Sequence, residues 1–385
     1  MPNNFWRTTD TILIAAVLLA ACGGGSGGAG TGPAAAGSLD THFGVGGIVT
    51  TPIGSSNDSI EAAALQSDGK IVVVGASMNG ANFDFAVGRY LANGSLDADF
   101  ATDGKAITPI SSGWDSAAAV DLQTDGKIMA AGFSPNASNF DIALVRYNAN
   151  GSLNADFGMD GKVTTAIGSG DDAASAVAVQ SDGMIMVAGK SHNGNKFDYD
   201  VARYKTDGSL DSNFGTNGKL ITAIGDGDDM ISDVILQSDG KIVAAGYSES
   251  GAKRNFALVR YHSNGSLDTL FGAGGKLSTV IGSGHDEIKA VALQSDNKIV
   301  VAGYSHNGGN NDFALARYLT DGSLDPNFGT GGKRVTAIGN GHDMANAIAI
   351  QSDEKVVAAG NAHNGSNYDF ALARYLTDGS LDPSF

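Results

Sequence analysis

A segment of 57 residues occurs six times in this chain, and this repeat constrains the fold more than any other feature. In residues 234–248 (VILQSDGKIVAAGYS), two apolar runs flank a Ser-Asp-Gly turn, which is the pattern of a β-hairpin. The aspartates of this turn are spaced by 57 residues throughout: Asp68, Asp125, Asp182, Asp239, Asp296 and Asp353. Such a period predicts one array or ring of equivalent units, although 385 residues would otherwise suggest two or three domains.

Each repeat contains four strand-like segments separated by Gly-rich turns. In one copy they are residues 219–224 (KLITAI), 231–237 (ISDVILQ), 241–248 (KIVAAGYS) and 255–262 (NFALVRYH). Four short strands per repeat are typical of a β-propeller blade, and an open β-solenoid is the alternative. We expect the Ala-rich segment (residues 61–66 in the first copy) to be the inner strand, because small side chains suit the crowded axis. The Thr-rich segment is then the outer strand.

The two ends of the chain predict how the ring closes. An outer-strand segment, residues 47–51 (GIVTT), precedes the first inner strand, whereas the chain ends with a third-strand segment, residues 370–375 (FALARY). Pairing the two would complete the last blade and remove two exposed strand edges. The prediction is an all-β, six-bladed β-propeller of four-stranded blades over residues 37–385, closed by the N-terminal outer strand and the last blade. The GSLD turns at residues 37–43 and 379–385 are then redundant.

The N-terminal residues differ in composition from the repeats. Residues 11–21 (TILIAAVLLAA) form an apolar run that is too short to span a bilayer. Cys22 is the only cysteine, so no intrachain disulfide is possible. Residues 19–22 (LAAC) resemble the lipobox of bacterial lipoprotein signal peptides. The resemblance implies that the signal peptide, residues 1–21, is removed and that Cys22 is acylated. An ordinary secretory signal peptide with a stray cysteine is the alternative.

Residues 22–36 (CGGGSGGAGTGPAAA) would then be the lipidated cysteine and a flexible tether. The residue after the cysteine is Gly23 rather than Asp, which for the sorting rule of some lipoproteins implies the outer membrane. We therefore expect a cell-envelope protein that reaches the membrane through its lipid anchor. The sequence leaves open whether it faces the periplasm or the cell surface.

The formal net charge of −17 argues against nucleic-acid binding, which needs clustered Lys and Arg. It suits a soluble extracytoplasmic domain or one that binds cations. None of the HExxH, Walker or EF-hand patterns occurs in the sequence.

The repeat motifs resemble those of a known family. The segments LQSDGKIVAAG (residues 236–246), FALARY (residues 313–318) and DGSLDPNFG (residues 321–329) are similar to the delta-60 repeat, a β-propeller-type repeat of uncharacterised function in secreted bacterial proteins. The resemblance covers residues 37–385 in six copies. It implies a propeller fold and an extracytoplasmic setting, and it implies no catalytic residues.

One aspartate in every copy lies just before the predicted inner strand. These six residues are Asp58, Asp115, Asp172, Asp229, Asp286 and Asp343. Near the axis they could form a ring that binds a cation such as calcium, because unpaired carboxylates would repel one another. The alternative is that each accepts hydrogen bonds from turn amides or pairs with a third-strand arginine. Those arginines are Arg89, Arg146, Arg203, Arg260, Arg317 and Arg374.

The loops on one face of the ring differ among the copies. They join the outer strand to the next inner strand, and the second strand to the third; we call this the varied face. The remaining turns are almost identical and form the uniform face. A ligand site needs chemical asymmetry, so the candidate ligand face is the varied one. Its candidate residues are Trp114, His192, His285, His306, His342 and His363.

Two kinds of binding are possible at this face. His285 with His306, and His342 with His363, could hold a metal together with the neighbouring aspartates, and solvated loop histidines are the alternative. Trp114 could stack on a sugar ring, and packing between blades is the alternative.

Together these features predict a lipid-anchored binding or interaction module of the cell envelope, monomeric, with an envelope protein or a glycan as its partner. No cofactor is required, although calcium remains open. One alternative is a metal-dependent, lactonase-like or glycan-cleaving propeller enzyme, which is an analogy from fold alone. The other alternative is a purely structural envelope protein.

Overall fold

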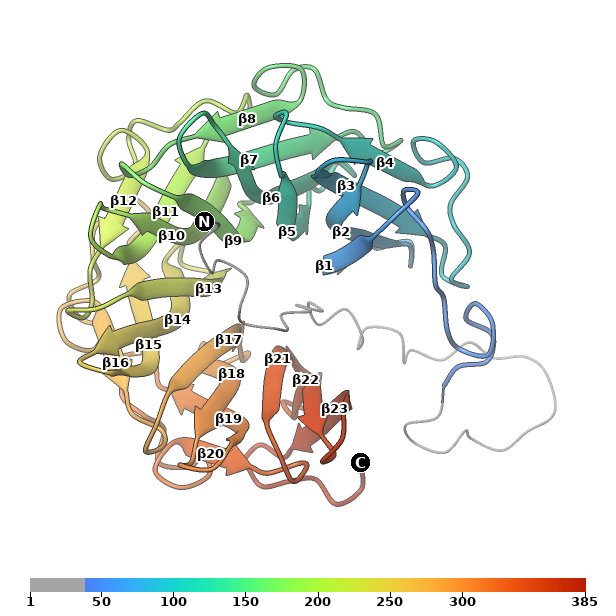
Figure 1. Cartoon of the computed structure of the whole chain (residues 1–385). Helices are drawn as coiled ribbons and strands as arrows, with labels where there is room; N and C mark the ends of the chain where they lie inside the picture. Colours follow the sequence, from blue (N-terminus) through green and yellow to red (C-terminus); the bar gives the residue numbers. More distant parts are fainter. Residues whose placement is uncertain (1–38) are drawn as a thin grey trace.

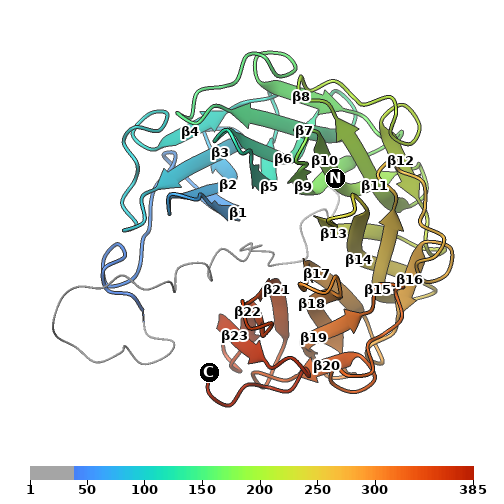
Figure 2. The same ribbon diagram turned by 180° about the vertical axis from the view of Figure 1, so that it is seen from behind.

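The computed structural model describes residues 39–385, so the predicted signal peptide, Cys22 and the tether lie outside the described residues. The chain forms six antiparallel sheets, which surround a central axis as the blades of a propeller (Figures 1 and 2). Five sheets have four strands and the last has three. The predicted six-bladed β-propeller is therefore confirmed, with an incomplete last blade. No helix in the described part of the chain has the length and hydropathy of a membrane span.

In each blade the chain runs outward from the axis, and we number the blades from the first (β1–β4) to the sixth (β21–β23). The inner strands are β1 (Asp58–Leu65), β5 (Ser116–Leu122), β9 (Asp172–Val179), β13 (Asp229–Leu236), β17 (Asp286–Leu293) and β21 (Asp343–Ile350). The second strands are β2 (Ile71–Met78), β6 (Ile128–Pro135), β10 (Ile185–His192), β14 (Ile242–Ser250), β18 (Ile299–His306) and β22 (Val356–His363).

The third and outer strands complete each sheet. The third strands are β3 (Phe83–Tyr90), β7 (Phe140–Tyr147), β11 (Phe197–Tyr204), β15 (Lys253–Tyr261), β19 (Asn311–Tyr318) and β23 (Tyr368–Tyr375). The outer strands are β4 (Lys105–Thr108), β8 (Lys162–Thr165), β12 (Lys219–Thr222), β16 (Lys276–Thr279) and β20 (Lys333–Thr336).

The Ser-Asp-Gly turn joins β13 to β14, as the hairpin pattern predicted. Gly240 adopts a φ of 83°, which a residue with a side chain rarely takes, and donates a hydrogen bond to the carbonyl of Gln237 at 2.9 Å. Asp239 Oδ1 accepts a hydrogen bond from the backbone N–H of Lys241 at 3.1 Å. These contacts fix the turn, so the second strand starts at the same position in every copy.

Neighbouring blades pack through apolar side chains. Phe256 and Leu258 of the fourth blade are fully buried against Ile288 and Ile299 of the fifth. Equivalent clusters join the first blade to the second, the second to the third, the third to the fourth, and the fifth to the sixth. The described residues thus contain five such interfaces. Each forms because the apolar face of one sheet must be covered by the sheet of the next blade.

The first and sixth blades do not form a sixth interface of this kind. Figures 1 and 2 show the two blades apart, and residues 47–51 form no strand, so β23 has no outer partner among the described residues. Phe370 and Leu372 of β23 are consequently 83% and 53% exposed, whereas the equivalent Phe313 and Leu315 are fully buried. The predicted closure is not formed in this structure.

The N-terminal segment nevertheless contacts the first blade as an outer strand would. Gly44 N–H donates to the carbonyl of Asn93 at 2.7 Å, and Lys105 Nζ donates to the carbonyl of Pro52 at 2.7 Å. Between consecutive complete blades the same two contacts recur, for example from Gly215 to Asn264 and from Lys276 to Ala223. The segment therefore occupies the place of an outer strand that precedes the first blade.

Candidate binding face

The six aspartates predicted before the inner strand are the first residues of that strand or lie directly before it. Asp286 accepts hydrogen bonds from the backbone N–H groups of Ile281 at 2.7 Å and Gly282 at 3.1 Å. Asp58, Asp115, Asp172, Asp229 and Asp343 accept the same two bonds in their own copies. Each carboxylate thus fixes the loop that leads into its blade on the varied face.

The pKa shifts of Asp58 and Asp172 come from the local surroundings of each carboxylate. Burial raises the pKa of Asp58, but hydrogen bonds from Ser77, Ile53 and Gly54 outweigh it and hold the pKa below its usual range. Burial is also the largest influence on Asp172, whose pKa is raised. In neither case is another member of the six a cause. Within residues 39–385, no three His, Cys, Asp or Glu side chains come close enough to hold a metal ion.

The third-strand arginines pair with a different aspartate, the one in the GSLD turn of the uniform face. Arg260 Nε donates to Asp268 Oδ2 at 2.9 Å, and its guanidinium lies 4.3 Å from the centre of the Phe271 ring. Both charged side chains are almost fully buried. The same pairing occurs in four further copies, whereas Arg146 meets the neutral Asn154. The uniform face is therefore held by one repeated contact.

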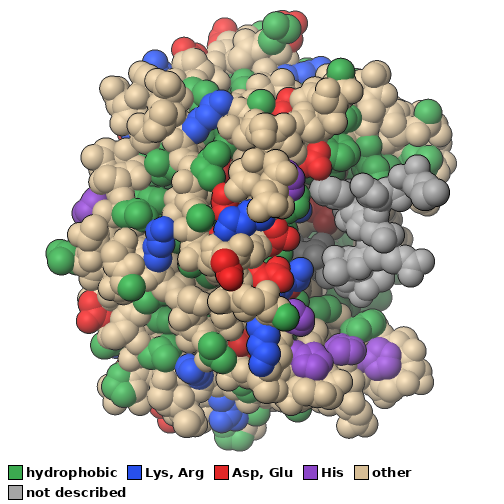
Figure 3. Space-filling view, turned by 60° about the vertical axis from the view of Figure 1, so that its left-hand side comes forward, with side chains coloured by type: hydrophobic (Ala, Val, Ile, Leu, Met, Phe, Trp, Pro, Cys, Tyr) green, Lys and Arg blue, Asp and Glu red, His purple; other side chains and the backbone are tan. Residues whose placement is uncertain are grey.

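Three of the predicted histidines are the last residues of second strands, directly before the loop to the third strand. His306 Nδ1 accepts a hydrogen bond from the N–H of Gly308 at 3.1 Å, and His192 and His363 accept the same bond from Gly194 and Gly365. The His306 ring lies over Gly284, where a side chain would clash with it. Figure 3 shows several histidine side chains gathered at one part of the surface.

The other two histidines contact the preceding blade. His285 Nδ1 accepts a hydrogen bond from the backbone N–H of Arg254 at 3.3 Å, and His342 Nδ1 accepts one from Asn311 at 3.1 Å. His285 also lies beside His306, whose backbone N–H donates to its carbonyl at 2.9 Å. The structure thus brings together the two histidines of each predicted pair, with every Nδ1 atom engaged by a backbone amide.

Trp114 lies between the first and second blades. Its ring stacks on Phe83 with 5.3 Å between ring centres and 29° between planes, and the side chain is half-buried. Beside it, the N–H of Asp115 donates to the carbonyl of Phe83 at 2.8 Å. Trp114 therefore packs between blades, and part of it remains exposed on the varied face.

A charged cluster between the fourth and fifth blades was not predicted. Arg254 forms an ion pair with Glu287 and lies over the ring of Tyr247 at 4.5 Å, and Lys289 Nζ lies 3.1 Å from the second oxygen of Glu287. Burial raises the pKa of Glu287, but Lys289, Arg254 and a hydrogen bond from Tyr304 outweigh it and lower the pKa to about 2. The other copies have no charged residue at the positions of Arg254 and Glu287, so this cluster makes the varied face asymmetric.

A comparison of the copies at one position would have revealed this cluster. The residues that occupy the position of Glu287 elsewhere are Ser59, Ser116, Ala173, Met230 and Met344. A single charged residue among small or apolar ones signals a local pairing. Its partner could not be found in the same way, because Arg254 lies 33 residues earlier and on another blade.

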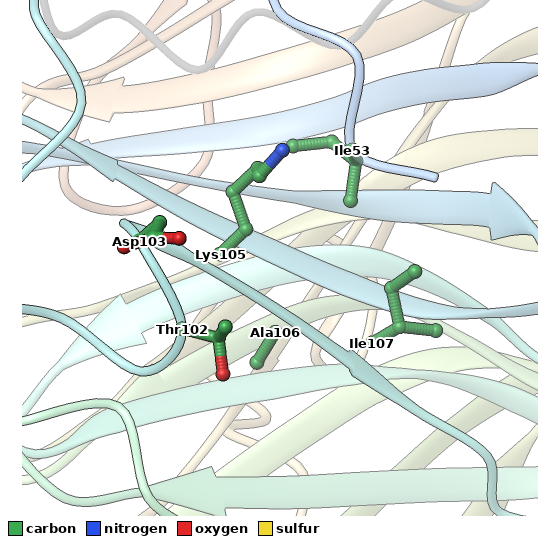
Figure 4. A pocket seen from close by; sticks show the side chains of 6 residues that line it. All are labelled: Ile53, Thr102, Asp103, Lys105, Ala106 and Ile107. Carbon is green, nitrogen blue, oxygen red and sulfur yellow. The ribbon is translucent and has the colours of Figure 1, made fainter. Parts of the chain in front are cut away.

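A cavity of about 480 Å³ lies at the outer rim, beside β4 (Figure 4). Its wall combines Ile53 and Ile107 with Thr102, Asp103 and Lys105. Lys105 is already bonded to the carbonyl of Pro52. The cavity therefore borders the N-terminal segment rather than the axis, and it contains none of the predicted site residues.

Solved structures with the same fold are distant in sequence. A protein from Lactobacillus plantarum superposes with a TM-score of 0.51 at 14% identity, over 85% of this chain and 84% of that one. An ulvan lyase of a polysaccharide lyase family, bound to a GlcA(1-4)Rha3S unit, superposes with a TM-score of 0.51 at 9% identity, over 83% and 80%. These similarities show the fold alone.

No curated protein matches the sequence. A family model matches six segments of 35 residues each, which together make up 210 of the 385 residues: 66–100, 123–157, 180–214, 237–271, 294–328 and 351–385. Each segment runs from the hairpin turn through the third strand to the turn phenylalanine, and therefore contains the repeated contacts of the uniform face. The chain belongs to the family described as the domain of unknown function (DUF5122) beta-propeller.

Proposed function

We propose that this protein is a binding module of the cell envelope, attached to the membrane by acylated Cys22, and that the varied face carries its contact surface. The observation that supports this proposal is the difference between the two faces. On the uniform face, one contact between arginine and the GSLD turn recurs in every complete repeat. On the varied face, the equivalent loops carry Trp114, histidine pairs and the Glu287 cluster.

These side chains are partly exposed, which supports a role in binding a partner in addition to their packing within the fold. Trp114, His192, His306 and His363 are half-buried, and Arg254 keeps 34% of its side chain exposed. Aromatic and arginine side chains that are partly covered by their own fold are frequent anchors of binding surfaces. A protein or glycan of the envelope is the partner class that such a surface fits.

An enzyme at the axis has less support. A metal-dependent hydrolase or lyase would need carboxylates free to bind a metal or move protons. The candidate carboxylates near the axis, such as Asp286 and Asp343, each accept two backbone hydrogen bonds and are fully buried. The polysaccharide lyase that shares the fold is similar in backbone only.

We further propose that the ring closes when residues 48–51 become the fourth strand of the sixth blade. In the fifth blade Phe313 pairs with Thr336, and Leu315 with Arg334. Applied to the sixth blade, this register pairs Phe370 with Thr51 and Leu372 with Val49. Closure would bury Phe370 and Leu372, which is worth about 1.5–3 kcal/mol for each side chain. The contacts of Gly44 and Pro52 with the first blade already hold the segment as a preceding outer strand.

The binding proposal can be tested by placing a photo-crosslinker on either face of the third blade. Asn195 is exposed in the varied loop, and Ser181 is exposed in the uniform hairpin turn. p-Benzoylphenylalanine in place of Asn195 should capture an envelope component in intact cells, and the product should decrease in a Trp114→Ala variant. The same group in place of Ser181 should capture none. Equal capture at both positions, or capture at Ser181 only, would contradict the proposal.

A further inference from the structure

In the third and fourth blades, the residue just before the inner-strand aspartate accepts a hydrogen bond from the blade before it. Asp171 Oδ1 accepts the backbone N–H of Phe140 at 3.0 Å, and Asp228 Oδ1 accepts that of Phe197 at 2.9 Å. These bonds tie the start of the third strands β7 and β11 to the next blade on the varied face. A carboxylate accepts such a bond at any pH at which it is ionised.

In the last two interfaces a histidine replaces this aspartate. His285 Nδ1 accepts the N–H of Arg254, and His342 Nδ1 accepts the N–H of Asn311. A histidine accepts at Nδ1 only while that nitrogen carries no proton, because both ring nitrogens of the charged form are donors. Histidine is also the side chain that ordinarily gains its proton between about pH 7 and 5.

From this substitution we infer that the contacts of the fourth blade with the fifth, and of the fifth with the sixth, open on mild acidification. The contacts of the second blade with the third and of the third with the fourth stay closed. The same chain therefore contains the pH-sensitive contacts and their insensitive counterparts at equivalent positions. This inference concerns the blade contacts themselves and does not depend on the identity of a ligand.

Acidification should also weaken the hydrogen bonds inside the loops next to these histidines. His306 and His363 accept the N–H groups of Gly308 and Gly365 through Nδ1, at 3.1 Å. The backbone N–H of His363 also donates to the carbonyl of His342 at 3.0 Å. Acidification thus removes two acceptors in each of the last two blades.

The charged side chains around His285 differ from those around His342. Around His285 they are Lys253, Arg254, Asp286, Glu287 and His306. Lys253 Nζ donates to the carbonyl of Ser283 in the loop of His285, at 2.6 Å.

Around His342 the charged neighbours are Asp312, Asp343 and His363. None of these acidic groups can replace Nδ1 as the acceptor without moving the loop, because Asp343 already holds Ile338 and Gly339 and Asp312 holds the side chain of Asn307.

Hydrogen–deuterium exchange of single amides in the full chain tests this inference. Protection factors at about pH 7.5 and about pH 5.5 are compared after correction for the intrinsic exchange rate. Protection of the Arg254 and Asn311 amides should fall about fivefold, the effect of losing one hydrogen bond. Protection of the Phe140 and Phe197 amides should change by less than about twofold, because an aspartate carboxylate is ordinarily ionised at both pH values.

Variants provide the matched control. His285→Asp and His342→Asp introduce the residue that the third and fourth blades use, and they should abolish the response at Arg254 and Asn311 respectively. A parallel fall at all four amides, or an unchanged response in the aspartate variants, would overturn the inference.

Discussion

The guanidinium group of Arg317 in the fifth blade donates a hydrogen bond from Nη1 to the carbonyl oxygen of Thr377 in the sixth blade, at 2.6 Å. Arg317 Nε also donates to Asp325 at 2.9 Å, and the guanidinium lies 4.7 Å from the centre of the Phe328 ring. One side chain therefore holds its own turn and the next blade together. In the sixth blade, Arg374 keeps the bond to its own turn, at Asp382.

This relationship predicts that Arg317→Ala destabilises the protein by about 3 kcal/mol, because the buried Asp325 carboxylate loses its closest cation. Arg146→Ala is the matched control: it removes the same bridge, but its turn partner Asn154 is neutral. The control should lose about 1–2 kcal/mol. Urea unfolding measures both values, and equal losses would show that the charge of Asp325 contributes nothing.

Asp200 is a buried carboxyl group in β11 at a position where the other five copies have alanine. Neither of its oxygens has a hydrogen-bond partner among the described residues, and burial, followed by the nearby Asp172, raises its pKa well above the ordinary value. Asp200→Ala should therefore raise the free energy of unfolding by about 2 kcal/mol at neutral pH.

The gain from Asp200→Ala should depend on pH. The folded carboxyl keeps its proton, whereas the unfolded one releases it above about pH 3.9, so the stability of the unmodified chain falls as pH rises above that value. The difference in unfolding free energy between variant and parent should shrink between about pH 7 and pH 4. A difference that is constant over this range would mean that Asp200 is ionised in the fold.

A chelator should leave the thermal stability of the propeller unchanged. The carboxylates predicted as a possible cation ring each accept two amide hydrogen bonds, so their stabilising contacts need no ion. Thermal melting of residues 37–385 with and without EDTA, together with elemental analysis, checks this. A stoichiometric metal whose removal lowers the melting temperature would restore the metal-binding alternative.

The proposed lipid anchor at Cys22 predicts the location of the whole protein. Cys22→Ala removes the only thiol that could be acylated and should move the protein from the membrane fraction to the soluble fraction of the envelope. Fractionation and immunoblotting measure this, with an Asn195→Ala variant as a control that should stay with the membranes. Retention of the Cys22→Ala protein in membranes would contradict the anchor.

Local patterns predicted most of this fold because each strand and turn recurs at a fixed spacing. The hairpin at Asp239 and the position of the outer strands follow from turn chemistry and alternation alone. The inner strands begin earlier than expected, as β13 does at Asp229 rather than at residue 231, because a β-bulge between Ile231 and Asp233 breaks the alternation.

Contacts between blades were harder to predict than the blades. The sequence places Arg and Asp in every copy, but it does not say that Arg260 selects Asp268, eight residues later, rather than Asp286. The pairing of Arg254 with Glu287 joins residues of two blades, so it depends on how the sheets pack. The roles of the histidines as acceptors of backbone amides depend on loop geometry in the same way.

The most direct test is whether β23 takes residues 48–51 as its fourth strand, since a closed ring is what makes the two faces continuous. Val49→Cys with Leu372→Cys, in a chain that also carries Cys22→Ser, places two thiols at the predicted register. Leu315→Cys with Arg334→Cys is the positive control, because those residues pair in the fifth blade. Mild oxidation of dilute protein should give an intramolecular disulfide in both variants. A disulfide in the control alone, or one that only links separate chains, would contradict closure of the ring.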